Sequence, residues 1–228
     1  EMGIEQDPPE GFVERLRDLL EERSEGRRAL FSEEDLEFAR ALYAARIRAL
    51  DRRVGELMAD LRRLGLDARA TLALLGTNGI ALQEHGDLWG DTVYTTVTRV
   101  PMLLRLPGGV VATTVNKNVE LIDLVPTLLE LSGIEAPAGL QGASLVAMIE
   151  GGGTPPYIGF GESPARVGQR FAALGGYRLV TGVDGGPSEM YHLLDDPLEL
   201  EDTAATEGDR VTVLERHLEA WAKMVAAT

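Results

Sequence analysis

The chain of 228 residues contains no cysteine. Neither a disulfide nor a thiolate metal site can therefore form, and cysteine usage gives no indication of the redox compartment. Long apolar runs are absent too, since none approaches the roughly 18 residues that a transmembrane helix needs. No signal peptide is recognisable. We expect a soluble protein, and its compartment stays open.

Basic residues are scarce relative to acidic ones. The chain has 22 Lys and Arg residues and 37 Asp and Glu residues, which gives a net charge of −15. A charge of this sign opposes binding to nucleic acid and to anionic membrane surfaces. We therefore expect neither as a partner. The chain is long enough to bury a sizeable core and to form one or two domains.

One long amphipathic helix is the clearest local prediction. Ser32 is a good N-cap, and Asp35 three residues later forms a weaker version of the capping box. Apolar residues then recur every three or four positions until Gly65, which predicts a helix of roughly 30 residues, about 45 Å long. We expect this stripe to pack on a sheet rather than to form a coiled coil. Its members are Leu36, Ala39, Tyr43, Ile47, Leu50, Val54, Leu57, Leu61 and Leu64.

Strand-like and helical segments alternate around this helix. A shorter amphipathic helix begins at Phe12 and is interrupted at Ser24-Glu25-Gly26. The continuous apolar run 70–75 predicts a strand covered on both faces, and 101–106 predicts a second strand. Asp123 is expected to cap a further helix that ends at Gly133. Helices between strands indicate an α/β fold with layers of both kinds.

The final third of the chain has a different composition and pattern. Residues 151–156 are rich in Gly, Thr and Pro, which predicts a linker between an α/β part at 1–150 and a small α+β part at 157–228. Gly175-Gly176 lies between two apolar runs and predicts a hairpin. Strands are expected at 157–160, 170–174, 177–181 and 189–194, followed by a helix from Val211 to Val225.

A polar, glycine-marked loop follows the first predicted strand. Thr77-Asn78-Gly79 comes directly after it, and Glu84-His85-Gly86 follows. From residue type alone, Asn78 is a turn residue that tolerates unusual backbone angles. His85 is either a proton donor or a loop histidine bonded to the backbone. Trp89 either rims a cleft or anchors the loop.

Five further segments follow one another along the chain: Leu42-Tyr43…Ile47…Asp51…Gly55, Tyr94…Arg99-Val100-Pro101, Asp123…Pro126-Thr127-Leu128, Gly139…Gln141-Gly142…Ser144-Leu145 and Met190-Tyr191-His192-Leu193…Asp196-Pro197…Glu199. In this order they resemble the sulfatases of the alkaline-phosphatase-like superfamily. The resemblance covers nearly the whole chain, but only the C-terminal half of a sulfatase. It implies that the other half carries the Cys or Ser that becomes the formylglycine nucleophile and two metal-binding Asp residues. This chain has no cysteine and no Ser-x-Pro-x-Arg run.

The resemblance also assigns roles within the loop. In the family, the strand ends in an Asp that binds calcium or a similar divalent cation together with the next residue. Here Thr77 stands at the position of that lost Asp, and Asn78 remains as a vestigial ligand. Because a hard cation prefers carboxylates, we expect weak or absent metal binding. His85 is the candidate catalytic residue, and His85 and Trp89 are the candidate substrate contacts, whereas Asp91 would repel a sulfate.

Three functions remain open. The chain is the nucleophile-lacking part of a sulfuric ester hydrolase, inactive alone and able to act on a sulfate ester only together with an N-terminal half. Alternatively, it is a pseudosulfatase that serves as a non-catalytic binding, structural or oligomerisation module. A helical interaction protein is the third possibility, but it does not explain the strand-loop-helix order. An isolated half would expose apolar faces, so we expect a homo-oligomer or docking to the missing half.

Overall fold

The computed structural model describes residues 7–24, 30–86, 88–108, 114–115, 117–153, 158–163 and 168–227. The chain forms two compact units. The first unit comprises Glu1–Thr92 and Thr96–Val110, and the second comprises Val93–Thr95 and Val111–Thr228. The predicted linker at 151–156 lies within the second unit, and its last three residues are outside the described part, so the predicted domain boundary stays a prediction.

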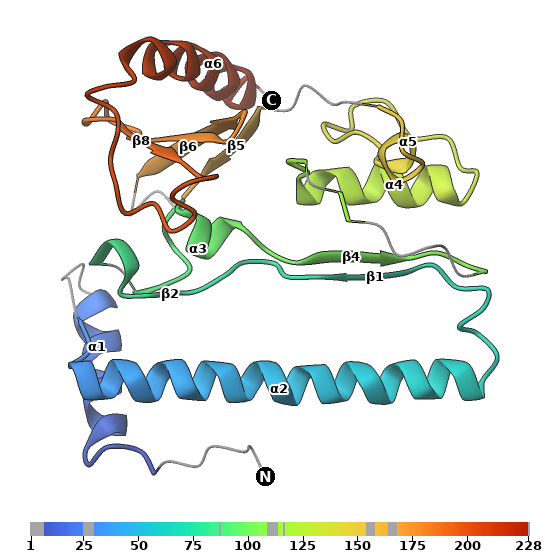
Figure 1. The fold of residues 1–228 in the computed structure, drawn as a ribbon, viewed down its shortest axis with the longest axis horizontal. Coiled ribbons are helices and arrows are strands. Elements are labelled where there is room, and N and C mark those ends of the chain that lie inside the picture. The colour runs from blue at the N-terminus through green and yellow to red at the C-terminus, as the bar shows by residue number, and fades with distance from the viewer. Residues whose placement is uncertain are drawn as a thin grey trace. The chain divides into compact units, whose positions relative to one another are not determined.

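Two helices open the first unit, α1 (Phe12–Ser24) and α2 (Glu33–Arg63) (Figure 1). Ser32 caps α2 as predicted, because its hydroxyl accepts a hydrogen bond from the amide of Asp35 at 3.2 Å. The capping box is wrong, however. The Asp35 carboxylate instead accepts two bonds of 2.6 Å from Arg15, and this bidentate pair ties α1 to α2. The predicted interruption at Glu25-Gly26 lies outside the described residues.

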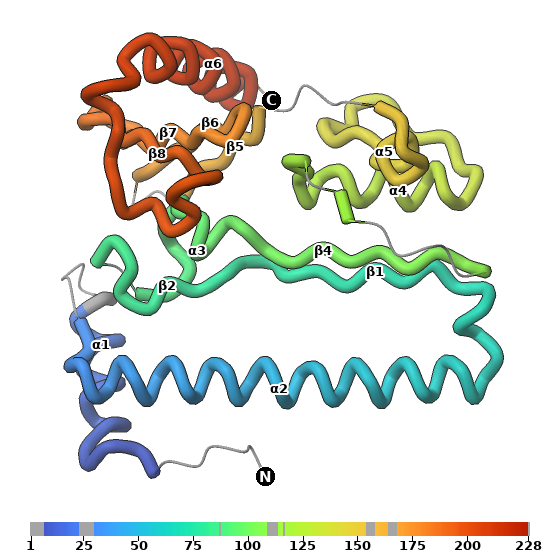
Figure 2. Tube along the Cα trace, in the orientation of Figure 1, coloured from blue at the N-terminus to red at the C-terminus, as the bar shows by residue number. Residues whose placement is uncertain are grey.

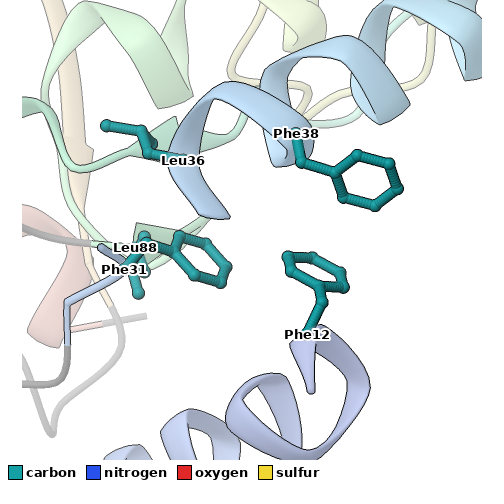
Figure 3. Close-up of a cluster of buried hydrophobic side chains, with 5 residues drawn as sticks. All are labelled: Phe12, Phe31, Leu36, Phe38 and Leu88. Carbon is teal, nitrogen blue, oxygen red and sulfur yellow. The ribbon is translucent and has the colours of Figure 1, made fainter. Parts of the chain in front are cut away.

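Aromatic rings form the core where α1 meets α2. Phe12 packs edge-on against Phe38, with ring centroids 4.8 Å apart, a favoured aromatic geometry. Figure 3 shows these two rings with Phe31, Leu36 and Leu88, which complete the buried cluster.

Beyond this core, α2 is uncovered. Its buried residues end at Ala45. Ile47, Leu50 and Leu57 are 48%, 55% and 56% exposed. The prediction that this stripe packs on a sheet is therefore confirmed only at its start, where Leu36 and Ala39 pack with the strand residues Leu82 and Leu88. Among the described residues it is wrong from Ile47 onward.

Two small antiparallel pairs of strands complete the first unit. β1 (Leu72–Leu75) pairs with β4 (Met102–Arg105), and Figure 2 traces them side by side. β2 (Ala81–Leu82) pairs with β3 (Leu88–Trp89), with the short helix η1 (Glu84–Gly86) between them, and α3 (Thr95–Thr98) lies between β3 and β4 in the chain. Ala73 and Leu74 are exposed, so the expected cover on both faces of β1 is wrong.

The second unit contains the predicted antiparallel sheet. Its strands follow one another in the order β5 (Gly159–Glu162), β6 (Gln169–Leu174), β7 (Tyr177–Gly182) and β8 (Glu189–His192). Gly175 and Gly176 turn between β6 and β7 with positive φ values of 60° and 85°, as the hairpin prediction requires. Helix α6 (Gly208–Ala226) packs on the sheet through Leu214 and Leu218 (Figure 1). The sheet, the hairpin and the helix are confirmed.

A buried junction also lies in the second unit, around η2 (Leu121–Asp123), α4 (Leu124–Leu131) and α5 (Val146–Ile149). The expected cap of α4 by Asp123 is wrong, because its carboxylate makes no cap bond to that helix. It accepts instead from the amides of Glu120 and Ala143, at 2.8 and 2.9 Å.

Thr127 makes a second link across the junction. Its hydroxyl donates to the carbonyl of Asp123 at 2.6 Å and accepts from the amide of Leu145 at 2.9 Å. A Cβ at Gly142 would overlap the carbonyl of Ile122, so only glycine fits there. Two segments of the sulfatase resemblance, 123–128 and 139–145, thus form one buried structural contact.

Candidate functional site

The loop after β1 satisfies its own polar groups. The hydroxyl of Thr77 donates to the amide oxygen of Asn78 at 3.1 Å. The amide nitrogen of Asn78 donates in turn to the carbonyl of Gly79 at 2.8 Å. Both side chains are exposed. The sequence Thr77-Asn78-Gly79 therefore forms a neutral, internally bonded turn.

Close backbone approaches hold this turn against the rest of the first unit. The amide of Gly79 donates to the carbonyl of Val97 at 2.6 Å, and a Cβ at Gly79 would overlap the carbonyl of Thr96. A Cβ at Gly90 would lie 2.8 Å from the amide nitrogen of Asn78. Glycine is therefore required at position 79, whereas a side chain at position 90 would displace the Asn78 side chain. The turn lies beside the end of β3.

The β2–β3 hairpin has an unusual backbone. Gln83, His85 and Trp89 have φ values of 76°, 53° and 77°, although none of them is glycine. Such left-handed conformations cost about 1–2 kcal/mol per residue. The Glu84 carboxylate supports the hairpin by accepting a hydrogen bond from the amide of Leu82. Backbone strain of this kind concentrates at functional sites, which makes this loop the candidate site.

The predicted site residues occupy different parts of the hairpin. His85 lies in η1 at its tip. Trp89 lies in β3 opposite Ala81. It packs on the buried cluster around Phe12 and Phe38, called the phenylalanine cluster below. The structure thus brings Asn78 close to Gly90, the residue after Trp89, and places His85 at the far end of the hairpin. Their roles toward a substrate stay predictions.

Several buried polar atoms near this loop were not predicted. Gln83 Oε1, Thr92 Oγ1 and Thr96 Oγ1 make no hydrogen bond to the described residues, and neither does Trp89 Nε1. Buried polar groups of this kind usually meet water or a ligand. Among these residues only Trp89 was a candidate from the sequence, and the residue types of the others gave no signal.

The donors of the turn do not fit a calcium-like cation. Such a cation takes six to eight oxygen ligands, mostly carboxylates. Thr77 and Asn78 are both neutral, and the amide oxygen of Asn78 already accepts the Thr77 hydroxyl. In the part of the chain that the structure describes, no group of three or more His, Asp or Glu side chains is arranged to hold a metal ion.

The residues that follow the loop are anchored in the second unit. Tyr94 is buried, and its hydroxyl donates to Glu189 Oε2 at 2.6 Å. The hydroxyl of Tyr191 donates to the same oxygen at 2.9 Å. Burial, reinforced by the Glu189 carboxylate, raises the pKa of Tyr94 and of Tyr191 well above the ordinary tyrosine value. Both hydroxyls therefore stay protonated and act as donors.

A buried ion pair completes this anchor. Glu199 is 1% exposed, and its Oε2 accepts from the amide and the hydroxyl of Thr95 at 2.6 and 2.7 Å. Its Oε1 lies 3.2 Å from Arg178 Nε. The Arg178 guanidinium also donates to the carbonyl of Val93 and lies 3.7 Å from the centre of the Phe171 ring. Burial lowers the pKa of Arg178 to about 10, which leaves it charged at neutral pH.

Comparison with protein families identifies the chain. The sulfatase family model matches residues 13–134, and the model for the C-terminal part of N-sulphoglucosamine sulphohydrolase matches residues 83–223. Each match covers more than half of the chain, and the chain therefore belongs to the sulfatase family. Membership of this family and the mixed α/β fold are thus both confirmed.

Individual relatives match only part of this chain, at low sequence identity. Arylsulfatase K of Bos taurus is 32% identical over 116 residues, which are 51% of this chain and 22% of that protein. Arylsulfatase K of Mus musculus is 27% identical over 195 residues, 80% of this chain and 35% of the relative. An N-acetylglucosamine-6-O-sulfatase of Bacteroides thetaiotaomicron is 31% identical over 117 residues, 50% and 21% respectively.

Solved structures share the fold. A protein in complex with its substrate D-glucosamine-2-N,6-O-disulfate has a TM-score of 0.69 at 23% identity, over 91% of this chain and 45% of that chain. The phosphonate monoester hydrolase of Agrobacterium radiobacter has a TM-score of 0.70 at 21% identity, over 88% and 44%. The chain therefore spans less than half of each of these proteins.

None of the helices within the described residues is long and apolar enough to cross a membrane.

Proposed function

We propose that this chain supplies the C-terminal part of a sulfatase-type ester hydrolase and does not cleave esters by itself. The observation that carries the proposal is the self-bonded Thr77–Asn78 turn, which stands where the family resemblance expects a metal-binding carboxylate. The absence of cysteine and of a Ser-x-Pro-x-Arg run supports it, since the nucleophile then has to come from another segment.

In this proposal the strained hairpin forms one wall of the substrate site. His85 at its tip faces the ester and can donate a proton to the leaving oxygen. Trp89 contributes its partly buried ring to the same wall and holds the hairpin on the phenylalanine cluster. The names of the matched relatives favour sulfate esters, including those of amino sugars, as the substrate class.

A non-catalytic role is the alternative. A pseudosulfatase would use the same fold as a binding or structural module. Thr77 favours this role because a hydroxyl replaces a negative ligand, and Asp91 favours it because a carboxylate near a sulfate repels it. The two roles differ in whether turnover appears once a nucleophile-bearing segment is present.

Turnover by the purified chain alone tests the first part of the proposal. With a chromogenic aryl sulfate and excess calcium, we expect no release of phenol above the rate in buffer, because the chain contains no nucleophile of the required type. The His85→Ala variant should behave identically. Release that exceeds the buffer rate and disappears in His85→Ala would show that the chain is a complete catalyst and would contradict the proposal.

A further inference from the structure

Helix α2 and the turn after it form a basic segment in an otherwise acidic chain. From Arg40 to Arg69 the sequence contains eight Arg residues and four acidic residues, which gives this segment a net charge of +4. The whole chain carries −15, so the residues outside the segment carry −19. Positive charge is thus concentrated on one helix, and an anionic partner would be attracted there rather than elsewhere on the chain.

The helical spacing places three of these arginines on one side of α2. At about 100° per residue, Arg48, Arg52 and Arg63 fall within about 60° of one another, on the side opposite Leu50 and Leu57. All three are exposed, and Figure 1 shows α2 as one continuous helix. Because this side is opposite the apolar one, it faces solvent whatever packs on the leucines. Arg48, Arg52 and Arg63 are called the basic face below.

The charges of the basic face are weakly compensated. Neither Arg48 nor Arg52 forms an ion pair with another described residue. Arg63 lies 3.1 Å from Asp60, but both side chains are at least 64% exposed, so the pair is screened by solvent and another anion can replace it. Glu56 lies on the same side as Arg52, one turn later, and lowers the local charge.

The chemistry and spacing of the basic face suit a polymer with repeated anionic groups. A guanidinium group donates two parallel hydrogen bonds to the oxygens of a sulfate or phosphate. Along the helix axis, Arg52 lies about 6 Å beyond Arg48, and Arg63 lies about 16 Å beyond Arg52. A small anion would therefore meet one of these groups only. An extended chain that runs along α2 can contact all three.

We propose that the basic face of α2 binds an extended sulfated polysaccharide. The inference rests on the proposed function, in which sulfate esters of amino sugars are the substrate class. The face would hold a part of the polymer that is not being cleaved, since none of its residues belongs to the β2–β3 hairpin. Nucleic acid is a poorer occupant, because its denser charge meets stronger repulsion from a chain of net charge −15.

Fluorescence anisotropy with the purified chain and a labelled heparin dodecasaccharide tests the proposal. We expect saturable binding that weakens as the salt concentration rises, because bound counterions are released on association. The same oligosaccharide after desulfation should bind at least about tenfold more weakly. Arg48→Gln combined with Arg52→Gln should raise Kd about tenfold and reduce the slope of log K against log salt concentration by roughly one to two.

Variants of the same helix provide matched controls. Arg46→Gln combined with Arg53→Gln removes the same charge from another side of α2 and should change Kd less than about twofold, whereas Glu56→Gln should tighten binding about twofold. Circular dichroism checks that each variant keeps its helix content.

Three outcomes would overturn the proposal: equal weakening by the two Arg pairs, equal binding of the desulfated oligosaccharide, or no saturable binding. Tighter binding of single-stranded DNA of equal charge would overturn it as well and assign the face to nucleic acid. Binding of the sulfated polymer without ester turnover, once a nucleophile-bearing segment is present, would retain the basic face and count only against the proposed function.

Discussion

Replacing Glu199 with alanine is expected to lower the free energy of unfolding of the second unit by about 3–5 kcal/mol. The substitution leaves the Arg178 guanidinium, 5% exposed, without its buried carboxylate partner. It also removes the acceptor for the amide and hydroxyl of Thr95. Urea denaturation followed by Trp221 fluorescence, in a Trp89→Phe background, measures this change.

A surface ion pair of the same unit provides the matched control. Glu162 pairs with Arg170 at 2.5 Å, but its side chain is 42% exposed. Exposed pairs contribute about 0–1 kcal/mol, so Glu162→Ala should change little. Glu199→Gln should fall between the two, because its amide oxygen can still accept from Thr95. Equal losses for Glu199→Ala and Glu162→Ala would show that the buried pair does not anchor the 93–95 segment.

A fusion can join this chain behind the part of the Bacteroides thetaiotaomicron N-acetylglucosamine-6-O-sulfatase that precedes the matched region. Introducing Thr77→Asp into this fusion should raise kcat/KM for an aryl sulfate by about 10³-fold. The new carboxylate restores the charge that a divalent cation requires at this position. A bound metal ion stabilises the charge of the transition state by several kcal/mol, and a difference of that size changes the rate by about this factor. Initial rates at saturating calcium measure it.

The wild-type fusion distinguishes the two proposed roles. A slow but measurable turnover that Thr77→Asp accelerates identifies a hydrolase with a weakened metal site. No turnover in the wild type together with activity in Thr77→Asp identifies a pseudosulfatase. Thr77→Asn, which adds no charge, is the control and should give no gain. An equal gain in Thr77→Asn would show that charge at this position is not the limiting feature.

The parts of the fold that local patterns determine were predictable. The N-cap at Ser32 and the regular apolar spacing define α2, and the Gly175-Gly176 turn defines the hairpin of the second unit. These features depend on neighbouring residues only. The order of the motifs was also sufficient to identify the family, because each motif is weak but their sequence along the chain is specific.

Features that depend on distant contacts were not predictable. The Asp35 carboxylate does not form the capping box because it accepts two hydrogen bonds from Arg15, twenty residues earlier. Within the described residues, the later part of α2 and the middle of β1 are exposed, although both have the apolar pattern of covered elements. Neither outcome is visible in the local pattern.

The roles of the candidate site residues stay predictions, and their geometry was not predictable. Asn78 lies in the turn after β1 and Trp89 in β3, and the close approach of Gly90 brings the turn beside the end of β3. The left-handed backbone of Gln83 and His85 has no signature in residue type, since neither is glycine. The buried pair of Arg178 and Glu199 joins positions whose contact only the folded sheet creates.

Calcium calorimetry on the purified chain tests the central claim most directly, because the claim is that the neutral turn after β1 no longer holds a divalent cation. Thr77 and Asn78 satisfy each other, and neither carries a charge. We expect no saturable heat on titration with calcium to millimolar concentration, and identical traces for the wild type and Asn78→Ala. Saturable binding with micromolar affinity that Asn78→Ala abolishes would contradict the account.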